Sequence, residues 1–391
     1  MRILFVSDVP ADPNSGAAGT EYQTILALRA GGHDVDAIWA DGMPRRITHP
    51  NLHYLLELPG SFARAIREAC IRKTYDVIHC NQPHAFLAAR EHRSLGRPGV
   101  FVNRSHGFET HVMAALGDWR NRWGLRERRF PRNLPGAVID AGVRRHCRLV
   151  LRYANGLIVS SGADRSYVLS CYNVAADRVA LIPQAAPEAY RMTPVRAQTP
   201  ERLRRLLFVG PSIFIKGPNV LGAAVSALLA IDPGLTFTWV CARDEQRLAA
   251  SHITAQVLSR VLFQDPMPQK ELLDCYDRHG VFLFPSLFEG FGKAFLEAMA
   301  RGLCVVASNT GGMADVITSG RDGVLVPAGD SVALADAVRG LVGRPDWARA
   351  IAAEARQTAL DYSWTRVGHE TAEFYQSLLS MRHRAVPPLS S

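Results

Sequence analysis

Apolar segments of strand length recur along the chain in two series, and no other feature constrains the fold as strongly. Each series alternates runs rich in Val, Ile, Leu and Phe with longer stretches of helical spacing, which is typical of parallel sheets joined by helices. The sequence therefore predicts an α/β protein with two Rossmann-like, doubly wound domains. The expected strands are 2–7, 35–39, 76–80, 100–103, 156–160 and 179–182 in the first series, and 206–210, 237–240, 261–263, 281–284, 305–307 and 324–326 in the second.

Chain length and composition agree with two domains. A chain of 391 residues exceeds what one core usually supports, and a hydrophobic content of 48% can supply two cores. A polar stretch with two prolines separates the series, so we place the domains at 1–190 and 204–363, with a linker at 191–203. Ligands of such folds bind at the carboxyl ends of the strands, which we expect to face an interdomain cleft.

Two carboxylates flank the start of one predicted helix, in the run Phe-Glu-Gly-Phe-Gly-Lys-Ala-Phe-Leu-Glu at 288–297. Glu289 is expected in the loop after a strand, and Glu297 inside the helix. Gly290 and Gly292 let the backbone approach a ligand closely, and the amides of the first helical turn suit phosphate or sugar hydroxyls. The run therefore favours a sugar-nucleotide site. The alternative is an amphipathic helix with two solvated glutamates.

The flanks of this run resemble the retaining nucleotide-sugar glycosyltransferases of family GT4, most closely over residues 203–340. They are Phe-Pro-Ser at 284–286, Glu-Ala-Met-Ala-Arg-Gly at 297–302, Val-Val-Ala-Ser at 305–308 and Gly-Gly at 311–312. The resemblance implies the GT-B fold and transfer of a sugar to an acceptor hydroxyl, as in polysaccharide or glycolipid biosynthesis. It also implies that the helix at 364–380 packs back on the first domain. We expect residues 382–391 to form a loose tail.

Individual roles also follow from the resemblance. Glu289 would contact the transferred sugar and Glu297 the nucleotide ribose. The backbone of Gly290, Phe291 and Gly292 would help to hold sugar and phosphate.

Lys216 follows Gly210 by six residues, after the first strand of the second domain. The spacing resembles the G-R-x-x-x-x-K-G element of the family, so we predict donor contacts from both residues and assign Lys216 to the leaving diphosphate. Pro211 stands where the family has an arginine, which puts the usual pair of cations in doubt. Lys293, at the start of a helix, is a candidate substitute for the phosphate contact. Its alternative is an exposed lysine that tolerates a small penalty from the helix dipole.

The first domain contributes two candidates. Gly16 lies in a Gly/Ala-rich loop after the first strand, which resembles the family loop whose backbone approaches the diphosphate. His106 precedes a glycine and matches the family H-G pair near the transferred sugar, so we count it with the catalytic candidates. Glu109 and His111 are secondary candidates. An ordinary tight turn and a structural histidine are the alternatives.

Residues 119–152 contain ten arginines against two acidic residues, and so account for most of the net charge of +9. Trp119, Trp123 and Phe130 lie among these arginines, a composition suited to an anionic membrane surface or a phosphate-bearing lipid. A solvated arginine-rich face is the alternative, because two prolines interrupt the segment. We expect no nucleic-acid partner.

Several classes of protein are disfavoured. No run reaches the roughly 18 apolar residues of a membrane-spanning helix, and Asp8 interrupts the N-terminal apolar stretch, so we expect a cytoplasmic protein, at most peripheral to the inner membrane face. The seven cysteines are scattered without C-x-x-C spacing, and we expect no metal and no cofactor. A nucleotide-sugar epimerase or hydrolase, or a noncatalytic sugar-nucleotide-binding protein, remains an alternative. The donor base, the sugar, the acceptor and the oligomeric state stay open.

Overall fold

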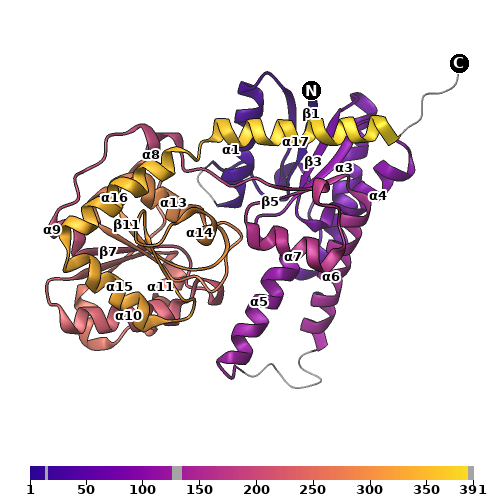
Figure 1. Cartoon of the computed structure of the whole chain (residues 1–391). Helices are drawn as coiled ribbons and strands as arrows, with labels where there is room; N and C mark the ends of the chain where they lie inside the picture. Colours follow the sequence, from indigo (N-terminus) through magenta and orange to yellow (C-terminus); the bar gives the residue numbers. More distant parts are fainter. Residues whose placement is uncertain (14–15, 126–133, 386–391) are drawn as a thin grey trace, which may run out of the picture. The chain divides into compact units, whose positions relative to one another are not determined.

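The computed structural model describes residues 1–13, 16–125 and 134–385, which form two compact units (Figure 1). Unit 1 comprises Met1–Pro183 together with the chain from Trp364 onward, and unit 2 comprises Gln184–Ser363. Each unit contains one six-stranded sheet in which every pairing is parallel. The predicted α/β class with two doubly wound sheets is confirmed.

The sheet of unit 1 has the strand order β2-β1-β3-β4-β5-β6. Its central strands are buried along their whole length, as expected for strands covered by helices on both faces. The strand order reverses between β1 and β3, so loops from these two strands diverge at the carboxyl edge and leave room for a ligand. The strands are β1 (Arg2–Val6), β2 (Asp34–Ile38), β3 (Val77–Asn81), β4 (Val100–Arg104), β5 (Gly156–Val159) and β6 (Val179–Leu181).

Helices cover this sheet, and the last helix of the chain is one of them. Helix α17 packs against α1 and β4, and a Cβ added at Gly368 would lie 2.7 Å from the Cβ of Ala27, so glycine permits the close approach of α17 to α1. Helix α1 begins at Ala17, which places part of the predicted Gly/Ala-rich loop in the helix, because alanine is a strong helix former. The helices are α1 (Ala17–Ala30), α2 (Pro50–Leu52), α3 (Leu58–Arg72), α4 (Phe86–Ser94), α5 (Glu109–Arg122), α6 (Leu134–Tyr153), α7 (Gly162–Tyr172) and α17 (Trp364–Ala385).

The sheet of unit 2 has the order β12-β11-β10-β7-β8-β9. Numbered within the unit, this is 3-2-1-4-5-6 read from the other edge, the order of dinucleotide-binding Rossmann folds. The order reverses between β7 and β10, so the loops that follow these two strands lie beside each other. The strands are β7 (Arg205–Val209), β8 (Thr236–Val240), β9 (Val261–Gln264), β10 (Val281–Phe284), β11 (Cys304–Ser308) and β12 (Val324–Val326).

The polar stretch interpreted as a linker is part of unit 2. The buried guanidinium of Arg301 pairs with Asp277 at 2.8 Å and donates hydrogen bonds to the carbonyls of Tyr190, Thr193 and Pro194. The boundary between the units therefore lies at Pro183, earlier than composition indicated, because composition does not show which groups satisfy the carbonyls of a segment. The helices of unit 2 are α8 (Glu188–Met192), α9 (Pro200–Leu203), α10 (Pro218–Ile231), α11 (Arg243–Ser251), α12 (Gln269–Arg278), α13 (Lys293–Ala300), α14 (Gly311–Val316), α15 (Ser331–Val342) and α16 (Pro345–Leu360).

None of the helices in the described ranges combines the length and the apolar character needed to cross a bilayer.

Candidate active site

Lys216 and Glu289 come from the two strands that flank the switch point of unit 2. Lys216 lies in the loop after β7, and Glu289 in the loop after β10. The amide of Leu287 donates to the carbonyl of Ile215 at 2.8 Å, which ties the two loops together. The structure therefore brings these predicted residues to one place, although they are 73 positions apart in sequence.

The carboxylate of Glu289 is buried and held by two donors. The ammonium of Lys216 forms an ion pair with Oε1 of Glu289, and the hydroxyl of Ser286 donates to the same oxygen at 2.8 Å. The Lys216 ammonium also lies 5.1 Å from the ring centre of Phe284, a cation–π contact. These contacts fix the position of Lys216 and direct its charge to the Glu289 side of the loop.

Close backbone packing shapes the loop between Glu289 and α13. Gly292 is the residue before α13 and has φ +87°, a conformation that favours glycine. Gly311 has φ +53°, and a Cβ added there would lie 1.9 Å from the carbonyl oxygen of Glu289. A Cβ at Gly312 would lie 2.6 Å from the carbonyl oxygen of Phe291. Glycines at 311 and 312 therefore let the loop after β11 support the backbone of the Glu289 loop.

Glu297 is buried on α13 with a partner at each oxygen. The hydroxyl of Tyr276 donates to Oε2 at 3.0 Å, and the ammonium of Lys293 lies 3.9 Å from Oε1. Burial, followed by the charge of Glu297, raises the pKa of Tyr276, which keeps it a neutral donor. Lys293, the first residue of α13, thus faces a carboxylate one helical turn away.

Gly210 directly follows β7 at the same sheet edge. Its amide donates to the carbonyl of Val240 at 3.0 Å, and its carbonyl accepts from the indole of Trp239 at 3.1 Å. The next residue, Pro211, cannot donate a backbone hydrogen bond and carries no charge. The ammonium that the structure places beside Glu289 is that of Lys216.

In unit 1, His106 belongs to a buried polar network. Its Nε2 lies 2.6 Å from Oε1 of Glu21, a fully buried residue of α1. Burial alone would raise the pKa of Glu21, but the hydrogen bond with His106 and the charges of His106 and Arg104 together hold it below its usual value. Burial also lowers the pKa of His79 to about 3, so this histidine is neutral at pH 7.

This network extends to the last helix and contains unpaired polar atoms. Nδ1 of His79 lies 2.5 Å from the hydroxyl of Tyr375 on α17. Among the described residues, Nδ1 of His106, Nε of Arg104 and Oγ of Ser105 have no hydrogen-bond partner. Buried polar atoms without partners are costly and mark positions where a polar ligand or water can bind.

Sequence reasoning did not select Glu21, His79, Arg104 or Tyr375. A polar residue inside an apolar strand, such as His79 in β3, is the signal that could have found them. Gly16 precedes the helix that carries Glu21, has φ −62°, and has no atom within 4 Å of an added Cβ. The fold itself therefore does not require glycine at position 16.

The secondary candidates Glu109 and His111 lie beside Asp164. His111 Nδ1 is 2.7 Å from Oδ1 of Asp164, whose other oxygen accepts from the amide of Phe108 at 3.1 Å. Burial raises the pKa of Glu109 to about 8, so this carboxyl is largely protonated at pH 7. A neutral acid can donate a hydrogen bond, which an ordinary surface glutamate cannot do.

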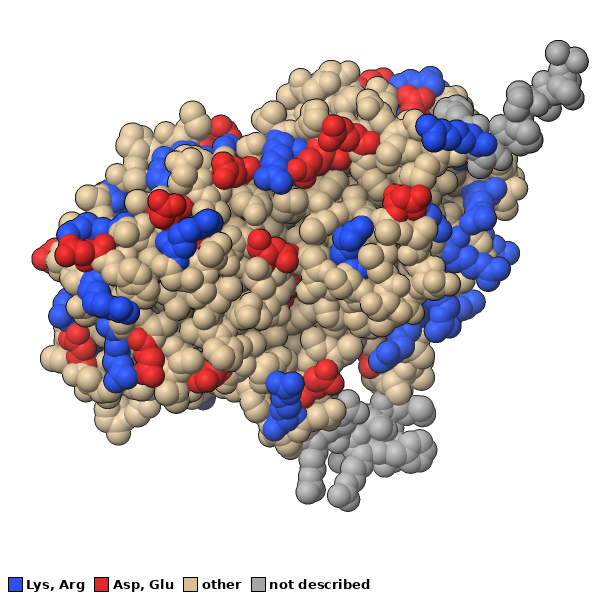
Figure 2. Space-filling view, in the orientation of Figure 1, with Lys and Arg blue, Asp and Glu red and all other residues tan. Residues whose placement is uncertain are grey.

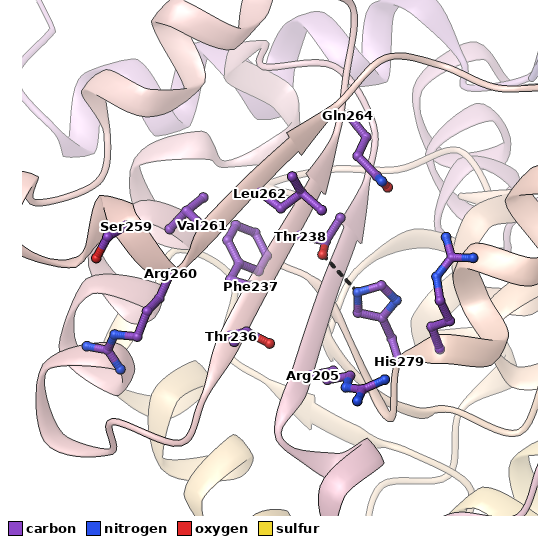
Figure 3. Close-up of a pocket in the computed structure, with 11 residues that line it drawn as sticks. Arg205, Thr236, Phe237, Thr238, Ser259, Arg260, Val261, Leu262, Gln264 and His279 are labelled. Carbon is purple, nitrogen blue, oxygen red and sulfur yellow. Dashed lines mark hydrogen bonds between the residues drawn. The ribbon is translucent and has the colours of Figure 1, made fainter.

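A pocket of about 400 Å³ in unit 2 lies away from these residues (Figure 3). It opens beside β8 and β9, and Arg205 and Thr236 line it at the amino ends of their strands. None of the predicted site residues lines it. The pocket therefore extends along β8 and β9 from their amino ends to Gln264, and no residue of the Glu289 loop lines it.

Within the described ranges, no three His, Cys, Asp or Glu side chains are grouped so that they could hold a metal ion. The predicted membrane-binding segment 119–152 is described only in part, and Phe130 and the arginines at 126, 128, 129 and 132 lie outside the described residues. In the described part, Trp119 and Trp123 pack together with ring centres 5.2 Å apart, and the guanidinium of Arg122 lies over Trp119.

Comparison with known families gives matches over both units. The family model described as "Glycosyltransferase Family 4" matches residues 15–188, and "Glycosyl transferases group 1" matches residues 204–344. Both models include residues described above, His106 and Glu21 in the first and Lys216 and Glu289 in the second.

Curated relatives carry the name D-inositol 3-phosphate glycosyltransferase. The protein of Frankia alni is 31% identical over 324 residues, which cover 78% of this chain and 75% of that protein. The protein of Corynebacterium urealyticum is 32% identical over 257 residues, 61% of this chain, and the match spans 60% of that relative's length.

Solved structures share the fold at lower identity. Sucrose-phosphate synthase from Thermosynechococcus elongatus has a TM-score of 0.74 at 20% identity, covering 97% of this chain and 100% of that chain. HepE of Anabaena, in complex with UDP-glucose, has a TM-score of 0.70 at 17% identity, covering 96% of this chain and 100% of that chain.

Proposed function

The chain belongs to glycosyltransferase family 4 and has the GT-B fold, and on this basis we propose that it moves a sugar from a nucleotide-diphosphate donor to an acceptor hydroxyl with retention of anomeric configuration. In this reaction the bond between the anomeric carbon and a phosphate oxygen breaks, and the acceptor oxygen forms the new bond. The acceptor proton passes to the departing phosphate, and a nucleoside diphosphate leaves.

The observation that carries the proposal is the buried Glu289 carboxylate with its two donors. Lys216 and Ser286 both bind Oε1. Oε2 accepts no hydrogen bond from any described residue, so it is the oxygen to which a sugar hydroxyl would donate. An acceptor in a fixed position orients a sugar without reorganisation during the reaction.

Lys216 and the amides that open α13 supply positive charge for the leaving group. Negative charge develops on phosphate as the glycosidic bond breaks, and an ammonium or a helix N-terminus stabilises it. We assign Lys216 to this task, and Gly290, Phe291 and Gly292 to backbone contacts with sugar and phosphate. Glu297 would accept bonds from the ribose through Oε1, the oxygen that faces Lys293.

Unit 1 would contribute His106 and the backbone at Gly16. His106 is held by Glu21 through Nε2, which directs its unpaired Nδ1 away from that carboxylate. We propose that His106 hydrogen-bonds the transferred sugar or the acceptor and that Gly16 approaches the diphosphate. The relatives' names favour a small phosphorylated polyol as acceptor, and the complexes of HepE favour a uridine nucleotide as donor.

The test is mass spectrometry of donor consumption with UDP-, GDP- and ADP-sugars in the presence of EDTA. We expect the wild type to hydrolyse one donor slowly without added acceptor or metal. Glu289→Gln should reduce this turnover by roughly 10²–10³-fold, the usual loss for one group that stabilises a transition state. Glu271→Gln removes an exposed carboxylate on α12 and is the matched control.

Wild-type turnover by Glu289→Gln would contradict the assignment of Glu289, and loss of turnover with EDTA would contradict metal independence. Donor binding without consumption, even with candidate acceptors, would favour a noncatalytic sugar-nucleotide-binding protein. The neutral Pro211, where the family has arginine, is the observation behind that alternative.

Peripheral contact of residues 119–152 with an anionic membrane is a separate part of the proposal. Two of the described arginines in this range, Arg120 and Arg122, are exposed on the last turn of α5. Vesicles of phosphatidylglycerol should co-sediment the wild type more than the double variant Arg120→Gln/Arg122→Gln. Equal co-sedimentation would argue against this part.

A further inference from the structure

A second pocket, of about 380 Å³, lies in unit 1 and carries a concentration of arginines. Arg93 from α4, Arg178 before β6 and Arg382 from α17 line it, together with His92 and Tyr153. Among the described residues, no Asp or Glu lines it. On the face drawn in Figure 2, Lys and Arg gather along the right-hand margin of the molecule.

Backbone carbonyls hold the three guanidinium groups in place. Arg93 donates to the carbonyl of Arg152 at 2.9 Å, and Arg178 donates to the carbonyl of Asn155 at 2.9 Å and to that of Leu151 at 3.0 Å. Arg382 donates to the carbonyls of Gly99 and Arg97. A guanidinium has five N–H donors, so these bonds orient each group and leave further N–H groups for a ligand.

Charge within the pocket is not balanced by carboxylates. In the part of the chain that the structure describes, Arg93, Arg178 and Arg382 form no ion pair, whereas Arg67, on the neighbouring helix α3, pairs with Glu91 at 2.7 Å. Asp177, next to Arg178 in sequence, has only a small effect on the pKa of Arg178. Burial and the charge of Arg93 lower this pKa more than Asp177 raises it. The charges of Arg93 and Arg178 therefore repel one another, and an anion between them would relieve that repulsion.

The pocket lies at the sheet edge opposite the candidate active-site residues of unit 1. Gly99 and Asn155 immediately precede β4 and β5, whereas His106 follows β4. The five residues of β4 span roughly 16 Å at about 3.3 Å per residue. A ligand in this pocket would therefore be distinct from a donor bound near His106.

We propose that this pocket is a second anion site that binds a phosphate group. Guanidinium groups bind phosphate through paired, charge-assisted hydrogen bonds, and Arg is favoured wherever such recognition is needed. The volume exceeds that of a lone phosphate, and the side chains of Tyr153 and Leu378 give the pocket an apolar part. The ligand class is a phosphate ester, either a small soluble molecule or a lipid headgroup.

Helix capping is the simpler account of the same contacts. The carbonyls that Arg93 and Arg178 bind lie at or just beyond the C-terminal end of α6, where cations are favourable without any ligand. Capping explains the hydrogen bonds that Arg93 and Arg178 donate to these carbonyls, but it predicts no phosphate binding. The two accounts are therefore separated by a binding measurement.

The other arginine-lined pocket supplies a matched control. Arg205, Arg260 and Arg278 line the pocket of unit 2, but the side chain of Arg260 points away from the groove in Figure 3 and donates to the carbonyl of Asp232 at 2.9 Å. Arg205→Gln removes one positive charge from that pocket, the same charge change as Arg93→Gln.

The test is isothermal titration of the full chain with inorganic phosphate and with glycerol 1-phosphate, at constant ionic strength set by chloride. We expect saturable binding with a Kd on the order of 1 mM. Arg93→Gln and Arg382→Gln should each weaken it about tenfold, because each removes a charge-assisted contact. Arg178 is left intact because it holds several carbonyls, and circular dichroism verifies that the variants are folded.

Two further variants locate the bound phosphate. Arg205→Gln and Lys216→Gln should bind phosphate like the wild type. Loss of binding in Lys216→Gln with retention in Arg93→Gln would place phosphate at the Glu289 loop and overturn the proposal. Absence of saturable binding to every probe would also overturn it.

Vesicles separate the two sources of phosphate. Co-sedimentation is measured with phosphatidylglycerol vesicles and with phosphatidylcholine vesicles as the reference. The ligand is a soluble molecule if the soluble esters bind and if vesicle binding is unchanged in Arg93→Gln and Arg382→Gln. Binding only to phosphatidylglycerol vesicles, lost in Arg93→Gln and Arg382→Gln, identifies a lipid headgroup. Donor turnover should be unchanged in these variants, so this site and the proposed transferase activity can fail independently.

Discussion

Unit 1 and unit 2 each place polar groups beside the switch point of a six-stranded parallel sheet, but they hold those groups by different means. In unit 2, glycines allow close backbone packing, and one short loop after each flanking strand supplies Lys216 and Glu289. In unit 1, long-range side-chain contacts link Glu21 in α1, His79 in β3 and His106 in the loop after β4. A parallel sheet thus supplies the position of a site, while local sequence decides whether backbone or side chains build it.

The two units should therefore be vulnerable to different changes. A site built by close backbone packing should be sensitive to any added atom at its glycines. A site built from buried ionisable side chains should be sensitive to pH. Three measurements separate these two behaviours.

Gly311→Ala should have the largest effect, in unit 2. The added Cβ would lie 1.9 Å from the carbonyl oxygen of Glu289, at a residue with φ +53°. Strain and overpacking together should lower the free energy of unfolding by about 2–5 kcal/mol, and displacement of the Glu289 loop should abolish donor turnover. Urea denaturation and the donor assay measure the two effects.

Gly320→Ala is the control for this substitution. Gly320 also has positive φ, +84°, but no atom lies within 4 Å of an added Cβ. Gly320→Ala should therefore lower the free energy of unfolding by about 1 kcal/mol, through backbone strain alone. If Gly311→Ala were no more destabilising than Gly320→Ala, close packing around Glu289 would not be what supports this loop.

Acid pH should destabilise unit 1 more than unit 2. Burial lowers the pKa of His79 and His84 to about 3, and of His92 and His146 to about 4, all in unit 1. Among the described residues of unit 2, one histidine has a pKa near these values, His279 at about 4.

The direction of this pH effect follows from the pKa of about 6.5 that a histidine has in the unfolded chain. Stability from a buried neutral histidine is fully present above that pH and is lost as pH falls towards the folded pKa, by up to about 1.4 kcal/mol per pH unit for each histidine. Glu109 acts in the opposite direction: its pKa of about 8 means that its contribution is complete below about 4.5 and is lost as pH rises to 8. The carboxyl of Glu109 therefore offsets only part of the stability that the four histidines of unit 1 lose as the pH falls.

Hydrogen exchange with mass spectrometry at pH 7, 6 and 5, corrected for intrinsic exchange rates, can resolve the two units. Peptides of β3 and β4 should lose protection faster than peptides of β10 and β11 as the pH falls. Equal loss in both units would show that the buried histidines do not govern the acid stability of unit 1.

Gly16→Ala should have the smallest effect on stability. Gly16 has φ −62° and open space around an added Cβ, so the free energy of unfolding should change by less than about 0.5 kcal/mol. If the backbone here approaches a diphosphate, the KM for donor should rise about tenfold, a loss of roughly 1.4 kcal/mol. Steady-state kinetics and thermal unfolding measure both.

Gly117→Ala in α5 is a matched glycine substitution, also with no atom within 4 Å of an added Cβ. Its KM should equal that of the wild type. A wild-type KM for Gly16→Ala as well would remove Gly16 from the set of donor contacts and leave the diphosphate to unit 2.

All twelve strands of the two sheets were predictable from sequence, with ends that differ by at most one residue from those observed. Strands buried on both faces read as apolar runs, and such runs are local signals. Lys216, Glu289 and Glu297 were selected through a local pattern around strand ends. Their roles remain predictions, but the proximity of Lys216 to Glu289 is now a structural fact.

The network in unit 1 could not be predicted in the same way. Glu21, His79, Arg104 and Tyr375 are spread over the chain, and each alone is an ordinary residue of a helix or strand. Only the packing of α1 and α17 against the sheet brings them together. The arginine pocket has the same origin, because Arg93, Arg178 and Arg382 come from three distant segments.

The sequence by itself determined that there are two parallel sheets, where each strand lies, and that a glycine-rich loop follows β10. These properties depend on neighbouring residues, through burial of apolar runs and the conformational freedom of glycine. Tertiary structure alone decided the strand orders, 2-1-3-4-5-6 in unit 1 and 3-2-1-4-5-6 in unit 2. Strand order depends on the sheet edge to which each crossover returns, which no local pattern encodes, and it decides which loops meet at a switch point.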